Sequence, residues 1–175
     1  MKKTVFFPIA VIVLTALLLL GVTLGLNGLA TENAQAQHLQ LMQTLLPGSE
    51  SFTLESYTGE DANILSVHKG EGGFVIETVT AGYADDLTVL VGVSDQGYVT
   101  GLVVNEMHET ASLGGNALTD WAFLSQFLKT EGDAKIGEGV DAISGATVTS
   151  NAIARCVNSA VAYVTGADVD SSATP

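Results

Sequence analysis

The chain has 175 residues, which is enough for one domain of ordinary size with an extra segment but too few for two large domains. Hydrophobic residues make up 47% of it, and its mean hydropathy of +0.38 is high for a soluble protein. Six basic residues face 19 acidic ones, which gives a formal net charge of −13. This balance disfavours nucleic-acid binding and attraction to anionic lipid headgroups, because both require a basic surface.

Cysteine and histidine give no pattern for a metal site. The single cysteine, Cys156, cannot form an internal disulfide or supply the cluster that zinc or an iron–sulfur centre needs. The three histidines, His38, His68 and His108, are far apart in the sequence. We therefore expect no bound metal.

The hydrophobic residues are concentrated near the N-terminus. No residue from Thr4 to Gly28 is charged, and a helix of this length, at about 1.5 Å per residue, spans the roughly 30 Å hydrocarbon core of a bilayer. Lys2 and Lys3 precede this segment, which favours a cytoplasmic N-terminus with the rest of the chain outside. We therefore expect a single-pass transmembrane helix in the cell (inner) membrane and an extracytoplasmic domain.

A cleaved signal peptide is the alternative to an uncleaved anchor. Ala34-Gln35-Ala36 has the small residues of a cleavage site, but the apolar region of a signal peptide is usually shorter, about 7–15 residues. All 19 acidic residues follow the apolar segment and only four basic residues accompany them, an excess of 15 negative charges. Such acidity favours solubility of the outer part.

A helical stalk is expected next, because Leu39, Met42 and Leu46 recur at helical spacing before Pro47-Gly48 ends the pattern. The small, polar C-terminal residues favour a disordered tail. The expected division of the chain is a cytoplasmic N-terminus and transmembrane helix at 1–28, a stalk at 29–46, a folded domain at 47–166 and a tail at 167–175.

The first half of the folded domain is rich in candidate strands. Phe74 to Thr80 alternates between two sets of side chains, and Leu87 to Val93 is β-branched and mostly apolar. Ser94-Asp95-Gln96-Gly97 has the composition of a hairpin turn. The links are short, so we expect an antiparallel meander. The five candidates are Phe52–Leu54, Ile64–Val67, Phe74–Thr80, Leu87–Val93 and Tyr98–Val104.

A short helix is expected after the strands. Thr119 or Asp120 can cap it, and Trp121, Leu124 and Leu128 then fall on one face. Trp121 is therefore either a core residue or a ligand contact.

A longer helix is expected over Thr147–Thr165, with Gly166 just beyond its last turn. Strands followed by helices indicate an α+β fold. Cys156 lies on the apolar face of this helix, where it is either a buried structural thiol or a reactive one. The apolar stripe comprises Ile153, Cys156, Val157, Ala160, Val161 and Val164.

The segment Asp141–Ser150 reads Asp-Ala-Ile-Ser-Gly-Ala-Thr-Val-Thr-Ser and enters the long helix. Gly145 and Ala146 are small enough for another molecule to approach the backbone closely. The free N–H groups and the positive end of the helix dipole favour an anion there. On these grounds alone, the segment is either an ordinary helix cap or a phosphate site. The helix start adds three hydroxyl groups, those of Thr147, Thr149 and Ser150.

This segment resembles the flavinylation motif Asp-x-x-Ser-Gly-Ala-Thr of the FMN-binding domain family, which includes RnfG of the Rnf electron transport complex and NqrC of the sodium-pumping NADH:quinone oxidoreductase. In that family a flavin transferase moves FMN from FAD onto the last threonine of the motif through a phosphoester. The resemblance implies covalent FMN on Thr147. It assigns the recognition sequence and the surroundings of the phosphate to Asp141, Ser144, Gly145 and Ala146, and we count Thr149 and Ser150 with them as candidate cofactor-binding residues.

The resemblance extends to the N-terminal side of the motif. Family members often have a Gly-Tyr turn, a strand reading Val-Gly-Val-Asp and a loop reading His-x-Glu-Thr-Pro-Gly-Leu-Gly. This chain has Gly82-Tyr83, Val91–Ser94 and His108–Gly114, although Ala111-Ser112 replaces Pro-Gly and His adjoins Glu directly. The loop residues Glu109, Thr110 and Leu113 are expected either to lie beside the flavin ring or to be purely structural.

The resemblance implies an electron-transfer subunit of an Rnf-type, ion-translocating ferredoxin:NAD⁺ oxidoreductase with FMN as one relay. Redox chemistry then belongs to the flavin ring, and no side chain is expected to act as an acid or base. The chain has no Gly-x-Gly-x-x-Gly, so NAD is expected to bind elsewhere. The expected partners are other membrane and peripheral subunits of the complex, together with a flavin transferase.

Other functions fit parts of the sequence. An NqrC-like subunit and a stand-alone membrane-anchored flavoprotein for extracellular electron transfer are the redox alternatives. The non-redox alternative is an anchored adaptor or pilin-like protein, which would also have an apolar helix before a β-rich domain. Pilins usually have a glutamate early in that helix, whereas no residue from Thr4 to Gly28 is charged here.

Overall fold

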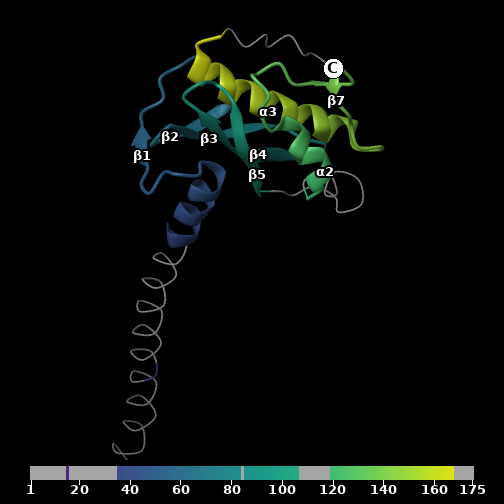
Figure 1. Cartoon of the computed structure of the whole chain (residues 1–175). Coiled ribbons are helices and arrows are strands. Elements are labelled where there is room, and N and C mark those ends of the chain that lie inside the picture. Colours follow the sequence, from purple (N-terminus) through teal and green to yellow (C-terminus); the bar gives the residue numbers. More distant parts are fainter. Residues whose placement is uncertain (1–14, 16–34, 84, 107–118, 168–175) are drawn as a thin grey trace, which may run out of the picture. The chain divides into compact units, whose positions relative to one another are not determined.

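A computed structural model describes residue 15 and residues 35–83, 85–106 and 119–167 (Figure 1). Apart from Thr15, the predicted transmembrane helix lies outside these residues, as does the loop that carries Glu109, Thr110 and Leu113. Within the described ranges, no helix is both long enough and apolar enough to cross a bilayer.

The domain is built on a five-stranded sheet in which each strand pairs antiparallel with the next one in sequence. This pairing confirms the predicted meander of five strands. Figure 1 shows how the strands lie. The strands are β1 (Thr53–Glu55), β2 (Ile64–Gly70), β3 (Gly73–Ala81), β4 (Asp86–Ser94) and β5 (Val99–Glu106).

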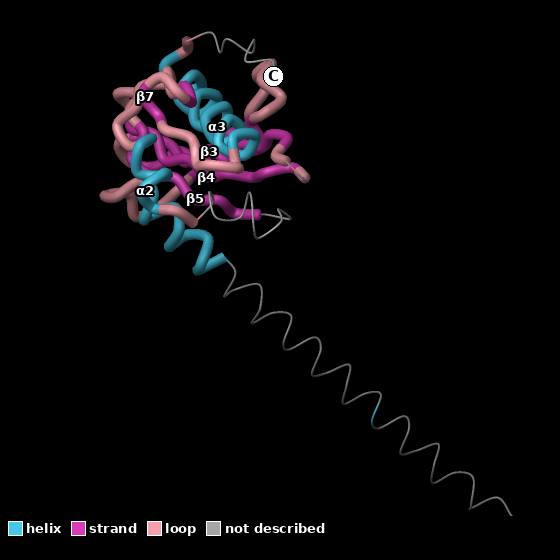
Figure 2. The backbone as a smooth tube through the Cα atoms, turned by 90° about the vertical axis from the view of Figure 1, so that its right-hand side faces the viewer, coloured by secondary structure: helices cyan, strands magenta, loops and turns pink. Residues whose placement is uncertain are grey.

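Alternation along β3 and β4 gives the sheet two different faces. Ile76 lies opposite Val91 in the register of these strands, and both are fully buried in the main hydrophobic core. This core lies between the sheet and α3 (Thr147–Thr165), which crosses the sheet as Figures 1 and 2 show. Val75 and Leu90 belong to a second, smaller cluster.

Helix α3 begins and ends where the sequence predicts. Ile153, Cys156 and Val157 have no exposed surface, and neither do Ala160 and Val161, which confirms the apolar stripe. After Thr165, Gly166 adopts a left-handed backbone with φ of 69°, and its N–H donates to the carbonyl of Ala162. This conformation ends the helix and favours glycine.

The short helix differs from its prediction. Asp120 caps α2 (Trp121–Leu124) by accepting hydrogen bonds from two backbone N–H groups, as expected. The chain then tightens into the 3₁₀ helix η1 (Ser125–Phe127), so the α-helical spacing on which the predicted face depended does not persist. Trp121 is 70% exposed, which rules out the core as one of its two predicted roles. The buried residues of this segment are Phe123, Leu124 and Phe127.

Two very short strands, β6 (Lys135–Ile136) and β7 (Gly139–Val140), were not predicted. They pair parallel as a separate two-stranded sheet. Gly137, in the tight turn between them, and Gly139, the first residue of β7, have positive φ angles. Strands of two residues carry no measurable periodicity, which is why the sequence does not reveal them.

The second cluster is covered by the end of the helix at residues 35–45. Leu45 and Leu46 are buried there against Val75 and Leu90. Leu45 can lie close to the sheet because Gly92 of β4 is paired with Gly101 of β5, and neither glycine has a side chain on the surface that Leu45 contacts. The compact unit that carries the sheet accordingly begins at Leu41.

Replacement of Gly92 by alanine should lower the stability of the full chain by about 1–3 kcal/mol, the usual cost of overpacking. The added methyl group would clash with the Leu45 carbonyl oxygen, a backbone atom that has little room to move. Gly101→Ala is the matched control, because its added methyl group would lie 3.1 Å from a Leu45 side-chain atom and no closer than 3.3 Å to the Leu45 backbone. Thermal unfolding in detergent should rank Gly92→Ala well below Gly101→Ala. Equal melting temperatures would contradict this close packing.

Cys156 should be an inert thiol. Burial raises its pKa from 9.0 to about 11, and a hydrogen bond with Thr78 opposes part of this rise. Little thiolate therefore exists at pH 8, and a disulfide reagent should label the unfolded chain far faster than the native one. Because the folded thiol holds its proton more tightly than the unfolded one, the free energy of unfolding falls as the pH rises from about 9 to about 11. Rapid labelling of the native chain at pH 8 would disprove this.

Candidate functional site

The loop of residues 141–146 leads from β7 into α3 and carries the predicted motif. Asp141, Ser144 and Gly145 are exposed on it, whereas Ala146 is buried. Thr147, the first residue of α3, is exposed. The hydroxyl group that the sequence singles out for attachment is therefore accessible at the protein surface.

The shape of the loop follows from Gly145. The Ala146 N–H donates to the Ile143 carbonyl at 2.9 Å, which closes a tight turn. Gly145 is the third residue of that turn, and its φ of 82° favours glycine there. The buried Ser150 hydroxyl holds the turn from inside, since it donates to the Ala146 carbonyl at 2.9 Å and accepts from the Ile143 N–H at 3.4 Å. Ser150 thus shapes the loop through its own internal bonds.

The N-terminus of α3 is suited to an anion. No described side chain caps it, and its first turn contains no acidic residue. The Ser150 N–H is bonded to the Ala146 carbonyl, so the donors without an acceptor within the helix are those before it. These N–H groups and the positive end of the helix dipole favour a phosphate at this position.

Thr149 supplies a second feature of the same helix end. Its side chain is 1% exposed, and its hydroxyl oxygen has no hydrogen-bond partner among the residues that the structure describes. A buried hydroxyl without a partner costs stability, commonly about 1–3 kcal/mol. An uncapped helix N-terminus, an exposed Thr147 and an unsatisfied hydroxyl together fit a bound phosphate group better than an ordinary cap.

Gln126 of η1 holds the start of the motif. Its carboxamide oxygen accepts from the Asp141 N–H at 2.8 Å, and its nitrogen donates to the Asp141 carbonyl at 3.4 Å. The sequence gives no sign of this pair, because the two residues lie 15 positions apart and glutamine belongs to no recognised motif here.

The structure brings together some of the predicted site residues and does not test others. Asp141 and Ser144–Ser150 lie on one loop and the first turn of α3. Glu109, Thr110 and Leu113 fall outside the described residues, so their place beside the flavin stays a prediction. In the part of the chain that is described, no group of three acidic, histidine or cysteine side chains is arranged to hold a metal ion.

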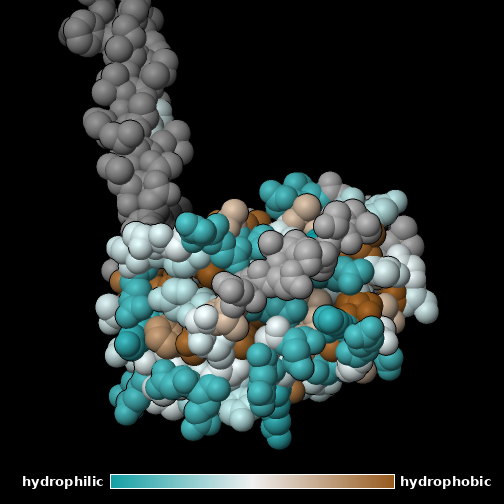
Figure 3. All heavy atoms as spheres, turned by 90° about the horizontal axis from the view of Figure 1, so that it is seen from above, coloured by the Kyte–Doolittle hydropathy of each residue, from teal (hydrophilic) through white to brown (hydrophobic). Residues whose placement is uncertain are grey.

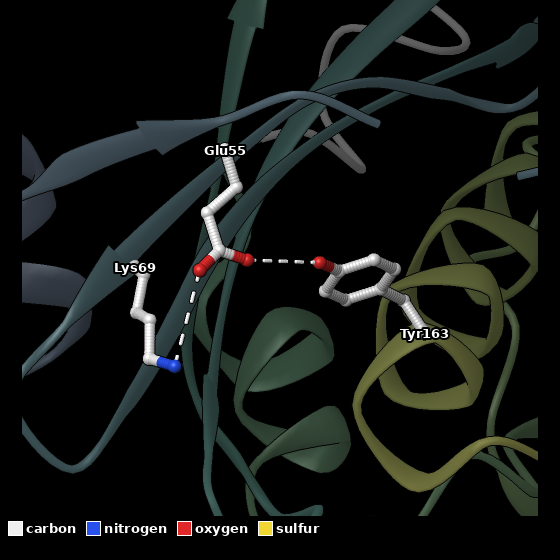
Figure 4. Close-up of polar contacts among 3 residues, drawn as sticks. All are labelled: Glu55, Lys69 and Tyr163. Carbon is white, nitrogen blue, oxygen red and sulfur yellow. Dashed lines mark hydrogen bonds and ion pairs between the residues drawn. The ribbon is translucent and has the colours of Figure 1, made fainter. Parts of the chain in front are cut away.

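A polar cluster lies toward the other end of α3 (Figure 4). Tyr163 donates from its hydroxyl to Glu55 at 3.2 Å, and Lys69 lies 3.8 Å from the other oxygen of that carboxylate. Desolvation, followed by the bond to Glu55, raises the pKa of Tyr163. Sixteen residues of helix, roughly 24 Å, separate Tyr163 from Thr147, so this cluster fastens β1 to the helix and is not part of the motif site.

Figure 3 shows one face of the domain. The face seen in Figure 3 is mainly hydrophilic, with scattered hydrophobic residues. Exposed hydrophobic side chains include Val148, at 48%, beside Thr147, and Trp121, at 70%, in α2. Val148 lies in the first turn of α3, and Trp121 lies in the helix that runs directly into η1, which carries Gln126.

Comparison with known proteins identifies the protein family of this chain. The model of the FMN-binding domain matches residues 82–162, which span β4, β5, the motif loop and most of α3. The G subunit of an ion-translocating oxidoreductase complex from Methanosarcina acetivorans is 33% identical over 144 residues, covering 73% of this chain and 75% of the relative. The chain belongs to the FMN-binding domain family.

Within this family the chain is similar to the G subunits of ion-translocating complexes. A further relative is the G subunit of the Na⁺-translocating ferredoxin:NAD⁺ oxidoreductase complex of Acetobacterium woodii, 35% identical over 98 residues, covering 51% of this chain and 47% of that protein. The G subunit of the proton-translocating complex of Clostridium ljungdahlii is 32% identical over 99 residues, with 53% of each chain covered. The chain thus spans about half the length of these two relatives. The predicted resemblance to the RnfG group is confirmed.

Replacement of Thr149 by valine should stabilise the cofactor-free chain by about 1 kcal/mol, because it removes a buried hydroxyl that has no partner and preserves the shape of the side chain. Thr78→Val is the matched control, since Thr78 is equally buried but donates to the Val89 carbonyl at 3.0 Å. Thermal unfolding should shift in opposite directions for the two variants. A loss of stability in Thr149→Val as large as that in Thr78→Val would show that the hydroxyl is bonded.

Proposed function

We propose that this protein carries FMN attached covalently to Thr147 and relays electrons through it as a subunit of an Rnf-type, ion-translocating oxidoreductase complex. The observation that carries the proposal is the position of Thr147. Its exposed hydroxyl stands at the first residue of a long helix whose N-terminus no described side chain caps, inside the region that matches the FMN-binding domain.

The attachment step uses the Thr147 hydroxyl as the nucleophile. Its oxygen forms a bond to the phosphorus of the FMN half of FAD, the phosphoanhydride bond breaks, and AMP leaves while the hydroxyl proton is released. A flavin transferase performs this step. The product is a phosphodiester whose one negative charge lies against the N–H groups at the start of α3.

The residues around the attachment point then hold the phosphate. The backbone N–H groups of the first turn and the buried Thr149 hydroxyl are donors for its oxygens. Ser144, Gly145 and Ala146 form the surrounding loop, and Gly145 lets the backbone turn tightly beside the group. When bound, the flavin ring supplies the redox chemistry, while the protein supplies position and electrostatics.

We expect side chains near the motif to pack against the flavin ring. We assign this role to Trp121 and to the loop residues Glu109, Thr110 and Leu113. Trp121 is exposed in α2, and the same α2–η1 segment is bonded to Asp141 through Gln126, which supports its proximity. An aromatic face that is exposed in the cofactor-free chain gains burial when a flavin stacks on it.

The remaining parts of the chain fit the same role. Residues 1–28 would anchor the protein in the cell membrane with its N-terminus in the cytoplasm, and the FMN domain would lie outside. Covalent attachment prevents loss of flavin there. The other membrane and peripheral subunits of the complex would supply and accept the electrons, bind NAD and move the ion.

The intact mass of the native chain, measured after denaturation, tests the covalent bond. We expect the wild-type chain from its own host to be heavier by one FMN less one water, and Thr147→Ala to have the unmodified mass. Thr149→Ala is the control for attachment at a neighbouring hydroxyl, and it should keep covalent FMN. An unmodified wild-type mass, or a modified Thr147→Ala chain, would refute the proposal.

A further inference from the structure

The motif loop has an anchor that comes from outside the motif. The Gln126 carboxamide pairs with both backbone groups of Asp141, at 2.8 Å and 3.4 Å, in the manner of one strand residue pairing with another. Asp141 itself is exposed. The two bonds hold the backbone of Asp141, and they therefore restrict the direction in which its side chain points into solvent.

The anchor is rigid because the core holds it. Gln126 lies in η1 between Leu124 and Phe127, both of which are buried in the main core, and Phe123 packs edge-to-face on Phe127 with ring centroids 5.2 Å apart. The position of the carboxamide is thus set by the same packing that holds α3. Gln126 connects the start of the motif to the fixed part of the domain.

The other end of the loop is held separately. The turn from Ile143 to Ala146 and the two Ser150 bonds fasten the loop to the first turn of α3. These bonds all lie within the motif segment and its helix. At the start of the loop, β7 holds Val140 through its pairing with β6 and its burial in the core, and Gln126 adds the side-chain bonds to Asp141 itself. Asp141 and Thr147 are consequently held in one relative arrangement before any cofactor is attached.

We propose that Gln126 is a positioning residue for flavin attachment, which holds Asp141 and Thr147 in the arrangement that a flavin transferase recognises on the folded domain. This inference rests on the proposed function. Gln126 touches neither FAD nor the reacting hydroxyl, and it acts through the Asp141 backbone. Its loss should slow attachment without preventing the domain from folding.

The test is the rate of FMN attachment to the full-length, unmodified chain, produced in a host without a flavin transferase and then incubated in detergent with purified flavin transferase and FAD. Gln126→Ala removes both hydrogen bonds, and Gln126→Met removes them while keeping the length of the side chain. Both variants should be labelled about tenfold more slowly, the size of effect that two modest hydrogen bonds can produce. The KM for FAD should be unchanged, because the defect lies in the acceptor.

Asn158→Ala is the matched control. Its side chain makes the same double contact with one backbone residue, Ala134, with both bonds at 3.0 Å, but it lies eleven residues, roughly 16 Å, along α3 from Thr147. It should lower the melting temperature at least as much as Gln126→Ala does and leave the rate of attachment unchanged. Hydrogen exchange at the Asp141 amide should be faster in the Gln126 variants alone.

The outcomes separate the two proposals. Attachment to wild type and to both Gln126 variants at the same rate would overturn the positioning role and leave the proposed function standing. A rate in Asn158→Ala that falls as far as in Gln126→Ala would overturn it also, because the effect would then follow stability. A wild-type chain that receives no FMN would remove the proposed function and this inference with it.

Discussion

The burial of α3 against the sheet is the constraint on which the rest of the structure depends. A stripe of five fully buried residues from Ile153 to Val161 fixes both the position and the rotation of the helix on the sheet. Because the helix cannot rotate or slide, its first turn is held at the surface with Thr147 exposed and Thr149 inside. The chemistry proposed for Thr147 is therefore a consequence of core packing some distance from it.

The acidity of the domain opposes the binding of an anionic cofactor such as FMN. The part that follows the apolar segment carries an excess of 15 negative charges, which repel a phosphate at long range. Salt screens such interactions over about 10 Å, whereas the N–H groups at the start of α3 act at hydrogen-bond distance. No acidic residue lies in that first turn, so the local interaction prevails. The covalent bond that we propose would further remove any dependence on the concentration of free cofactor.

Periodic patterns account for what the sequence predicts well. The alternation in β3, the β-branched apolar run of β4, the bounds of α3 and the Asp120 cap each depend on neighbours in sequence, and all are confirmed. The predicted common face of Trp121, Leu124 and Leu128 fails because α2 lasts only one turn before the 3₁₀ helix, so α-helical spacing does not apply. The hydrogen bonds of Gln126 to the Asp141 backbone and the contact of Leu45 with Gly92 join residues distant in sequence, and no single-sequence pattern encodes such pairs.

The sequence of the motif does not by itself distinguish a helix cap from a binding site. Its physical character, a small-residue loop before a helix, allows either a cap or a phosphate site, and the uncapped helix end with the unsatisfied Thr149 favours the latter. The most direct test of covalent FMN at Thr147 is ³¹P NMR of the native chain, unfolded in guanidinium and dialysed. A single phosphodiester resonance that survives this treatment is the predicted result. A chain without any phosphorus signal would contradict the attachment.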